Sequence, residues 1–388
     1  MKHLPLLAIA VISVVSVSSL AAQPKPEPAV RRLPASSADG TAASVQVADG
    51  ALVWTGQVVA TKFGGAVAAE CAGALQALGD VLGRRGSGLA AVVRLTAYVA
   101  DDATVQAVDA LVAKTWAQAP VACEIVRTPL AVTGARVAFE AVAPTTRAAS
   151  AVEIADGAAV MPAGAKIFIS GQAEKGADVA AAVRATMAGL HRSVAHLGLK
   201  KTDIVQVKGF IRPFADHAAA QREVAASFDG GAVPPVVLME WQSELFAEIE
   251  IVLSAKSLPA PGGDRVTYAW LPWLTKSPRY CHVTHVAGGT PLIFVGAVSG
   301  VDGGDARGQM KAIFERLGSV LFESGSSYRN LVKATYYLGD PKTRAVLGDI
   351  RGVYFDPTRP PSASALGVAG FGRPGRAASI AMIAVPVK

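Results

Sequence analysis

The sequence predicts an α+β fold made of three similar units in one chain, on two observations. The first is a helical stripe of apolar residues, spaced three or four apart, which recurs over 67–82, 179–197 and 310–321. The second is an alternating, β-rich segment behind each stripe, at 92–99, 204–211 and 331–338. One amphipathic helix is common by chance, but the same succession three times indicates an internal repeat.

Further elements complete each unit in the same order. A pair of strands precedes the stripe, around 51–57, 165–172 and 291–298. An aromatic residue holds the matching place in each alternating segment, and we expect core positions for Tyr98, Phe210 and Tyr337. A second helix and a proline-containing turn lead to a closing apolar strand, at 135–143, 247–255 and 377–385. Each unit therefore reads β-β-α-β-α-β-β.

Composition and charge narrow the class of protein. Of 388 residues, 51% are hydrophobic and 17% are charged, which excludes global disorder and allows a large core. The net charge of +7 is spread along the chain, without a basic block or a basic stripe interleaved with aromatics. The sequence therefore does not favour a nucleic-acid partner.

The N-terminus has the pattern of a secretory signal peptide, predicted over 1–22. Lys2 is followed by an apolar run to Leu20 and then by small residues. The alternative is an uncleaved membrane anchor, although the run is short for a spanning helix and contains serines. After cleavage no stable membrane span remains, so we expect an exported protein, periplasmic or secreted. Residues 23–42, rich in Pro, Ser and Gly, predict a disordered leader.

The repeat divides the rest of the chain into three domains. Their predicted ranges are 43–143, 151–255 and 279–388. The first linker is short. The second, 256–278, is rich in Pro and Gly and holds Trp270 and Trp273, which predict that it packs against the protein.

Short motifs in these units resemble the RidA family, the reactive-intermediate deaminases that are also labelled endoribonuclease L-PSP-like. The second unit carries Ile-Phe-Ile-Ser-Gly-Gln at 167–172 and Ala-Glu-Ile-Glu-Ile at 247–251. The third opens with Pro-Arg-Tyr-Cys-His at 278–282. The first has Trp-Thr-Gly-Gln at 54–57, in which we expect Thr55 to hold the place of Ser170. Three copies in register, covering nearly all of the mature chain, carry the resemblance.

The resemblance implies a chorismate-mutase-like fold, in which a sheet carries two helices on one face and three subunits form a trimer with ligand clefts between them. Three tandem RidA-like domains then suggest a monomer that forms its own intrachain pseudo-trimer. A sheet with one covered face needs a partner for the other, and a fused chain supplies it at high effective concentration. The alternative is three separate domains that each trimerise with other chains.

The resemblance also implies hydrolysis of small enamines and imines, of the 2-iminobutanoate/2-iminopropanoate deaminase type, without a cofactor. This chemistry needs an Arg for the substrate carboxylate, and that Arg is absent after the proline turn of all three units. Residues from different units could still complete one cleft. The candidate catalytic residues are Ser170, Glu140, Glu250 and Tyr280. The candidate ligand-binding residues are Thr55, Gln172 and Gln221.

Simpler structural roles compete with each assignment. Glu248 and Glu250 share one strand face, and such a pair, like Glu140, is more often solvated. Ser170 can satisfy a turn through its hydroxyl. We predict no metal site, because only Cys281 and His285 converge on one strand face. A Cys71–Cys123 disulfide remains open in an oxidising compartment.

Three functions follow from these observations. The first is an exported deaminase acting in a cleft between domains. The second is a catalytically degenerate scaffold that binds a small ligand or partner, which the missing Arg and the uneven loss of family positions favour. The third and weakest is RNA cleavage, which the family's older label implies.

Overall fold

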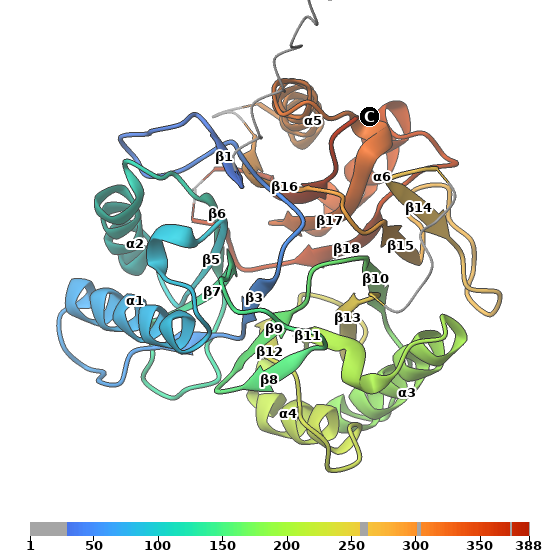
Figure 1. The fold of residues 1–388 in the computed structure, drawn as a ribbon, viewed down its shortest axis with the longest axis horizontal. Coiled ribbons are helices and arrows are strands. Elements are labelled where there is room, and N and C mark those ends of the chain that lie inside the picture. The colour runs from blue at the N-terminus through green and yellow to red at the C-terminus, as the bar shows by residue number, and fades with distance from the viewer. Residues whose placement is uncertain (1–28, 257–262, 301–303, 373–374, 388) are drawn as a thin grey trace, which may run out of the picture.

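The computed structural model describes residues 29–256, 263–300, 304–372 and 375–387 (Figure 1). The predicted signal peptide, 1–22, and the first part of the leader lie outside the described residues. Within them, no helix combines the length and the apolar character needed to cross a membrane.

The described residues form six α-helices, two in each predicted unit. Four begin at an Asp whose carboxylate accepts a hydrogen bond from a backbone N–H of the first turn, which caps the helix. The helices are α1 Val67–Arg84, α2 Asp102–Trp116, α3 Val179–His196, α4 His217–Ala226, α5 Ala306–Glu323 and α6 Pro341–Tyr354.

Three mixed sheets carry these helices. Sheet I has the order β6 (Ala122–Arg127), β5 (Arg94–Val99), β7 (Val137–Pro144), β3 (Leu52–Thr55), β9 (Ala158–Met161) and β8 (Glu153–Ala155), with β4 (Val58–Val59) also on β7. Sheet II has the order β12 (Val236–Glu240), β11 (Ile204–Ile211), β13 (Ala247–Ser254), β10 (Lys166–Gln172), β15 (Val283–Val286) and β14 (Val266–Ala269). Sheet III has the order β1 (Val30–Leu33), β2 (Ser44–Val47), β16 (Leu292–Ser299), β19 (Ala378–Ala384), β17 (Leu331–Leu338) and β18 (Ser362–Gly367).

The hairpin at the start of each unit pairs with the sheet of another unit. β8–β9 completes sheet I, β14–β15 completes sheet II, and the N-terminal β1–β2 completes sheet III. Each predicted domain range therefore contains only part of a sheet, because the two hairpin strands of each sheet lie outside the range that supplies its other strands. Two further corrections follow: part of the leader, Val30–Leu33, is a strand, and the linker contributes β14.

The helices of each unit cover one face of its sheet and form an apolar core with it. Figure 1 shows the three helix pairs on the outside and the three sheets facing inward. The predicted α+β class, with two helices on one sheet face, is what the structure has. Trp273 packs on the second of these cores, as expected for the linker.

The inner faces of all three sheets meet in two apolar clusters. One contains Trp54, whose ring centroid lies 6.4 Å from those of both Phe168 and Phe294. The other contains the repeated aromatics Tyr98, Phe210 and Tyr337, all fully buried, so their predicted core role is confirmed.

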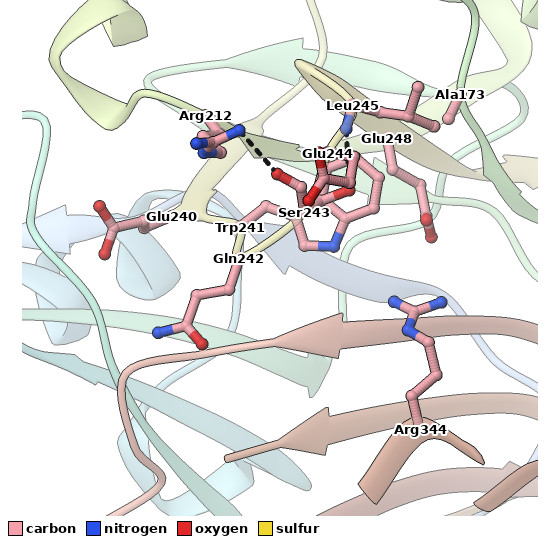
Figure 2. Close-up of a pocket in the computed structure, with 10 residues that line it drawn as sticks. All are labelled: Ala173, Arg212, Glu240, Trp241, Gln242, Ser243, Glu244, Leu245, Glu248 and Arg344. Atoms are coloured by element: carbon pink, nitrogen blue, oxygen red, sulfur yellow. Dashed lines mark hydrogen bonds between the residues drawn. The ribbon is translucent and has the colours of Figure 1, made fainter. Parts of the chain in front are cut away.

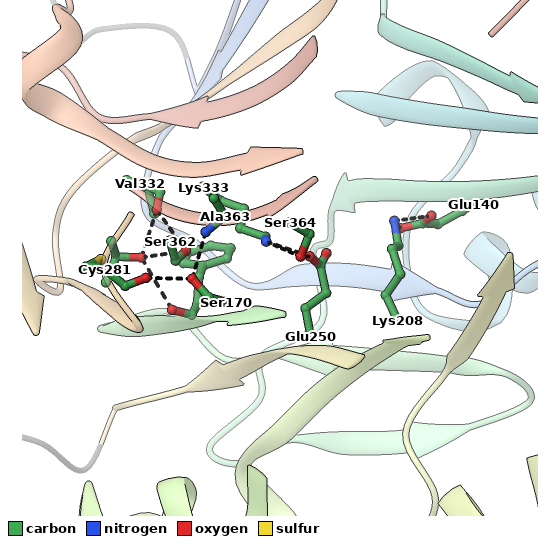
Figure 3. A network of polar contacts seen from close by, with 12 residues as sticks. Glu140, Ser170, Lys208, Glu250, Cys281, Val332, Lys333, Ser362, Ala363 and Ser364 are labelled. Atoms are coloured by element: carbon green, nitrogen blue, oxygen red, sulfur yellow. Dashed lines mark hydrogen bonds and ion pairs between the residues drawn. The ribbon is translucent and has the colours of Figure 1, made fainter. Parts of the chain in front are cut away.

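A layer of buried charges lies between these two clusters. On β11, Lys208 stands between Val205 of one cluster and Phe210 of the other. Its Nζ lies 2.8 Å from a carboxylate oxygen of Glu140, on β7 of the first unit. Similarly, Lys333 of the third unit pairs with Glu250 of the second at 2.5 Å (Figure 3).

The charge layer corrects the expectation that these glutamates are solvated. Glu140 is 2% exposed and Glu250 is 6% exposed. Alternation along a strand gives the face of a side chain, but it does not tell whether that face meets water or a second sheet.

We predict that the Lys208–Glu140 pair stabilises the protein only as a pair. Lys208→Met leaves a buried carboxylate without its partner and should lower the free energy of unfolding by about 3–5 kcal/mol. Lys208→Met/Glu140→Gln should recover most of this loss. Arg307→Met, which breaks an exposed pair with Asp349, is the control and should cost at most about 1 kcal/mol. Urea unfolding measures all three, and a cost below that of the control for Lys208→Met alone would contradict the prediction.

Candidate functional site

Two adjoining cavities lie where sheet II meets the third unit. The larger, of about 750 Å³, is lined by residues that include Arg212, Trp241, Glu248 and Arg344 (Figure 2). The smaller, of about 280 Å³, is lined by residues that include Ser170, Gln172, Glu248, Tyr280 and His282. Glu248 lines both cavities, so this residue lies between them.

Gly171 creates the space that the Glu248 side chain occupies. A Cβ atom at position 171 would lie 2.0 Å from Oε1 of Glu248 and 2.6 Å from its carboxyl carbon. The β10–β13 register shifts between Ile169 and Gln172, at this same place. The glycine of the Ser-Gly-Gln turn is therefore required by the close approach of a carboxyl group from the neighbouring strand.

The surroundings of Glu248 hold its carboxyl group close to neutrality. Burial raises its pKa to about 7, and the nearby Glu250 adds to the rise. Lys333, Arg344 and a hydrogen bond with Ser364 act in the opposite direction. A carboxyl group of this kind can both give and take a proton near pH 7, as general acid–base catalysis requires.

Arg344 brings a positive charge to the same cavity from another unit. It lies in the first turns of α6, and its Nη2 donates to the carbonyl oxygen of Ala365 at 2.5 Å. Figure 2 shows its guanidinium group and the Glu248 carboxyl pointing toward each other across the cavity. The arrangement can therefore bind a small anion beside an acid–base group.

Three of the predicted catalytic residues have structural partners. The Ser170 hydroxyl donates to the carbonyl oxygen of Cys281 at 2.6 Å and accepts from the N–H of Ala363 at 2.7 Å (Figure 3). It therefore fastens β10 to two segments of the third unit. Glu140 and Glu250 belong to the buried charge layer. The fourth candidate, Tyr280, lines the smaller cavity.

The predicted ligand-binding residues separate into different places. Gln172 lines the smaller cavity, and its side chain lies 3.3 Å from the Ser193 hydroxyl. Thr55 is buried and accepts a hydrogen bond from the N–H of Ala141. Gln221 is exposed on α4 and lines neither of the two cavities described above.

The strand register also corrects one expected equivalence. Trp54 pairs with the same closing-strand position as Phe168, so Thr55 corresponds to Ile169, and Gly56 to Ser170. The matching of Thr55 with Ser170 was therefore wrong by one residue. Gln57 then holds the place of Gly171, and its amide exchanges two hydrogen bonds with the backbone of Leu238 in the second unit.

The corresponding positions in the other two units lack the carboxyl group. Glu248 lies opposite Phe210, and the residues opposite Tyr98 and Tyr337 are Ala138 and Ser379. The place of Gly171 is taken by Gln57 in the first unit and by Ala297 in the third. Of these three related places, only the one between the second and third units combines a glutamate with the glycine that accommodates it.

The cysteine and histidine side chains were considered above for a disulfide and for a metal site. The three cysteines form no disulfide within the described structure. No group of three His, Cys, Asp or Glu side chains in the described ranges gathers closely enough to hold a metal ion. His282 instead accepts a hydrogen bond from the N–H of Leu271 through Nδ1.

Comparison with known proteins agrees with the resemblance. The family model described as Endoribonuclease L-PSP matches residues 279–386. A RutC family protein of Synechocystis is 38% identical over 66 residues, which are 17% of this chain and 51% of that protein. Residues 279–386 belong to the RidA family. The chain spans about half the length of this curated relative.

Solved structures of RidA relatives are similar to parts of the chain. The YjgF family member NMB1025 of Neisseria meningitidis is 21% identical, covers 32% of this chain and 96% of its own, and has a TM-score of 0.25. The Rid family protein YyfB of Yersinia pestis is 27% identical, with coverages of 28% and 88% and a TM-score of 0.25.

The Arg that the RidA resemblance implies is absent from its expected place in the structure as well. After the proline turn, β18 of the third unit begins with Ser362. Sequence reasoning missed both Arg344 and Glu248. Glu248 carried a signal, since it shares a strand face with Glu250, whereas nothing local to Arg344 indicates a cavity formed with another unit.

We predict that ionisation of Glu248 lowers the free energy of unfolding as the pH rises. Its pKa is about 7 in the folded chain against an ordinary value of 4.5, so the folded state holds this proton more tightly. The resulting stabilisation is complete below about pH 4.5 and is lost as the pH rises through 7. The free energy of unfolding of Glu248→Gln minus that of the wild type should therefore increase over this range and then level off. Urea unfolding from pH 4.5 to 8.5 measures it, and a difference independent of pH would exclude the raised pKa.

Proposed function

We propose that this protein hydrolyses small imines that carry a carboxylate, at one site between its second and third units. The observation that carries the proposal is the Glu248 carboxyl group facing Arg344 across a cavity, with a pKa of about 7. Arg344 supplies the carboxylate-binding role that the RidA resemblance assigns to an Arg elsewhere in the sequence.

The proposal includes an assembly in which three RidA-like units form a pseudo-trimer within one monomeric chain. Its support is the two central clusters shared by all three sheets and the hairpins exchanged between units. We also propose that the chain acts outside the cytoplasm, which rests on the signal-peptide pattern at 1–22.

The reaction uses Glu248 twice. A substrate carboxylate pairs with the Arg344 guanidinium, which places the imine carbon near Glu248. Ionised Glu248 takes a proton from a water molecule as the water oxygen bonds to that carbon. Glu248 returns this proton to the nitrogen, which gives a carbinolamine. It then takes the proton of the new hydroxyl group and passes it to the nitrogen as the carbon–nitrogen bond breaks, so that a 2-oxo acid and ammonia leave. One imine and one water are consumed, and the enzyme regains its starting state.

The alternative function is a scaffold that binds a ligand without turnover. The observation that favours it is the absence of a glutamate at the equivalent strand positions of the other two junctions, where Ala138 and Ser379 stand in the place of Glu248. The two functions differ in whether the junction that contains Glu248 catalyses imine hydrolysis or only binds a ligand.

The test is imine hydrolysis by the purified chain from about residue 23. An amino-acid oxidase generates the imines, and semicarbazide traps those that remain. We expect turnover above background, with Glu248→Gln lowering kcat by about 10²–10⁴-fold, as for loss of a general acid–base group. Arg344→Ala should raise KM mainly, and Arg344→Lys should restore part of the binding.

Two further variants separate chemistry from folding. Glu244→Gln changes an exposed carboxylate on the same cavity and should leave turnover unchanged. Gly171→Ala should displace the Glu248 carboxyl and lower kcat about as strongly as Glu248→Gln. A folded chain that hydrolyses no imine, or one whose turnover survives Glu248→Gln, would support the scaffold function instead.

A further inference from the structure

A buried hydroxyl group links the candidate acid–base residue to the charge layer. Ser364 lies on β18 of the third unit, and its hydroxyl donates to Oε2 of Glu250 (Figure 3). Lys333 Nζ lies 2.5 Å from the same oxygen and 3.4 Å from the Ser364 oxygen. All three side chains are buried, so water does not compete for these contacts.

Ser364 stands between two carboxyl groups but has only one proton to donate. Its hydroxyl donates to Glu250, and it also lowers the pKa of Glu248, which lies two residues away on the same face of β13. Glu250 has a second donor in Lys333, whereas Glu248 has no such cation at hydrogen-bond distance among the described contacts. Glu250 can therefore lose the hydrogen bond from Ser364 and still have a partner, because Lys333 remains in contact with the Glu250 carboxylate.

We propose that Ser364 is a positioning residue whose hydroxyl turns from Glu250 to Glu248 whenever Glu248 ionises, while Lys333 keeps its contact with Glu250. When Glu248 is protonated, Ser364 donates to Glu250. When Glu248 loses its proton, the hydroxyl rotates and donates to the new carboxylate. No bond other than the hydrogen bond changes, and the third unit thereby controls the protonation of a residue in the second.

Other charged and titratable groups also face Glu248. Arg344 approaches from α6, and Glu240, Glu244 and Arg212 lie around the larger cavity. Glu174, Tyr280 and His282 lie around the smaller one. These groups are unaltered in the variants below, so a change in the titration of Glu248 reports on the Ser364 contact and on Glu250.

The experiment is a pH titration of the full chain labelled with ¹³C at the glutamate carboxyl groups, followed by NMR. The Glu248 signal is the one that disappears in Glu248→Gln. Ser364→Ala should raise the pKa of Glu248 by about one unit, because the ionised form loses a donor. Glu250→Gln should lower it by a similar amount, because a nearby negative charge is removed. The two variants thus move the pKa in opposite directions.

A matched pair of variants guards against effects of altered packing. Ser364→Thr keeps the hydroxyl and should restore a pKa near that of the wild type. Ser362→Ala removes a buried hydroxyl of the same strand that contacts Val332 and Thr284, and it should leave Glu248 unchanged. If Glu250→Gln does not fold, the comparison of Ser364→Ala with Ser364→Thr decides alone.

The inference rests on the proposed function for its meaning, but its test does not use turnover. An unchanged pKa in Ser364→Ala, or equal values in Ser364→Ala and Ser364→Thr, overturns the role of Ser364 even if the chain hydrolyses imines. Conversely, a chain without imine hydrolysis that shows the opposite shifts retains the Ser364 switch and loses only the proposed reaction. With an active chain, the acid limb of kcat/KM should move with the NMR pKa.

Discussion

The structure depends on how the second face of each sheet is covered. Helices cover only one face, and the other is apolar at both ends of its strands. Exposed to water, such faces would aggregate, so the three sheets pack against one another. The charge layer between the clusters constrains this packing, because Lys208 and Lys333 each need a glutamate from a different unit. A shifted register would leave a buried charge without its partner, at a cost of several kcal/mol.

The exchanged hairpins also hold the three sheets together, because each hairpin pairs with a sheet formed mainly by another part of the chain. Each hairpin leaves its own unit and pairs with the edge of another sheet, and β1–β2 returns from the N-terminus to sheet III. An unpaired edge at β16 would expose backbone N–H and C=O groups and part of the central cluster that includes Phe294. The first strands of the chain therefore finish the last sheet, and no unit holds a complete sheet by itself.

The sequence predicts those parts of this structure that have their own periodicity. Helical stripes and alternating strands predict the α+β class, because each pattern is local. The sheet that a short hairpin joins cannot be predicted in this way, because the alternation of its strands is the same whichever sheet it pairs with. Thr55 was matched one residue away from its true counterpart. Such a shift matters because moving one residue along a strand exchanges its two faces. Glu248 and Glu250 share a face, so alternation could not tell that one enters a cavity and the other a charge layer. Arg344 reaches the cavity through tertiary packing alone.

A fused chain allows its three junctions to differ, which three identical subunits cannot do. The Glu248 carboxyl destabilises the folded state at neutral pH, because burial opposes its ionisation. Three such groups would multiply this cost. At the other two junctions a small residue replaces the glutamate, and Gln57 fills one of them with hydrogen bonds to Leu238. These positions avoid the cost of a glutamate, and stability elsewhere in the protein can offset the partly buried carboxyl group at the third junction. Placing a glutamate at only one of the three related strand positions thus limits this cost in stability.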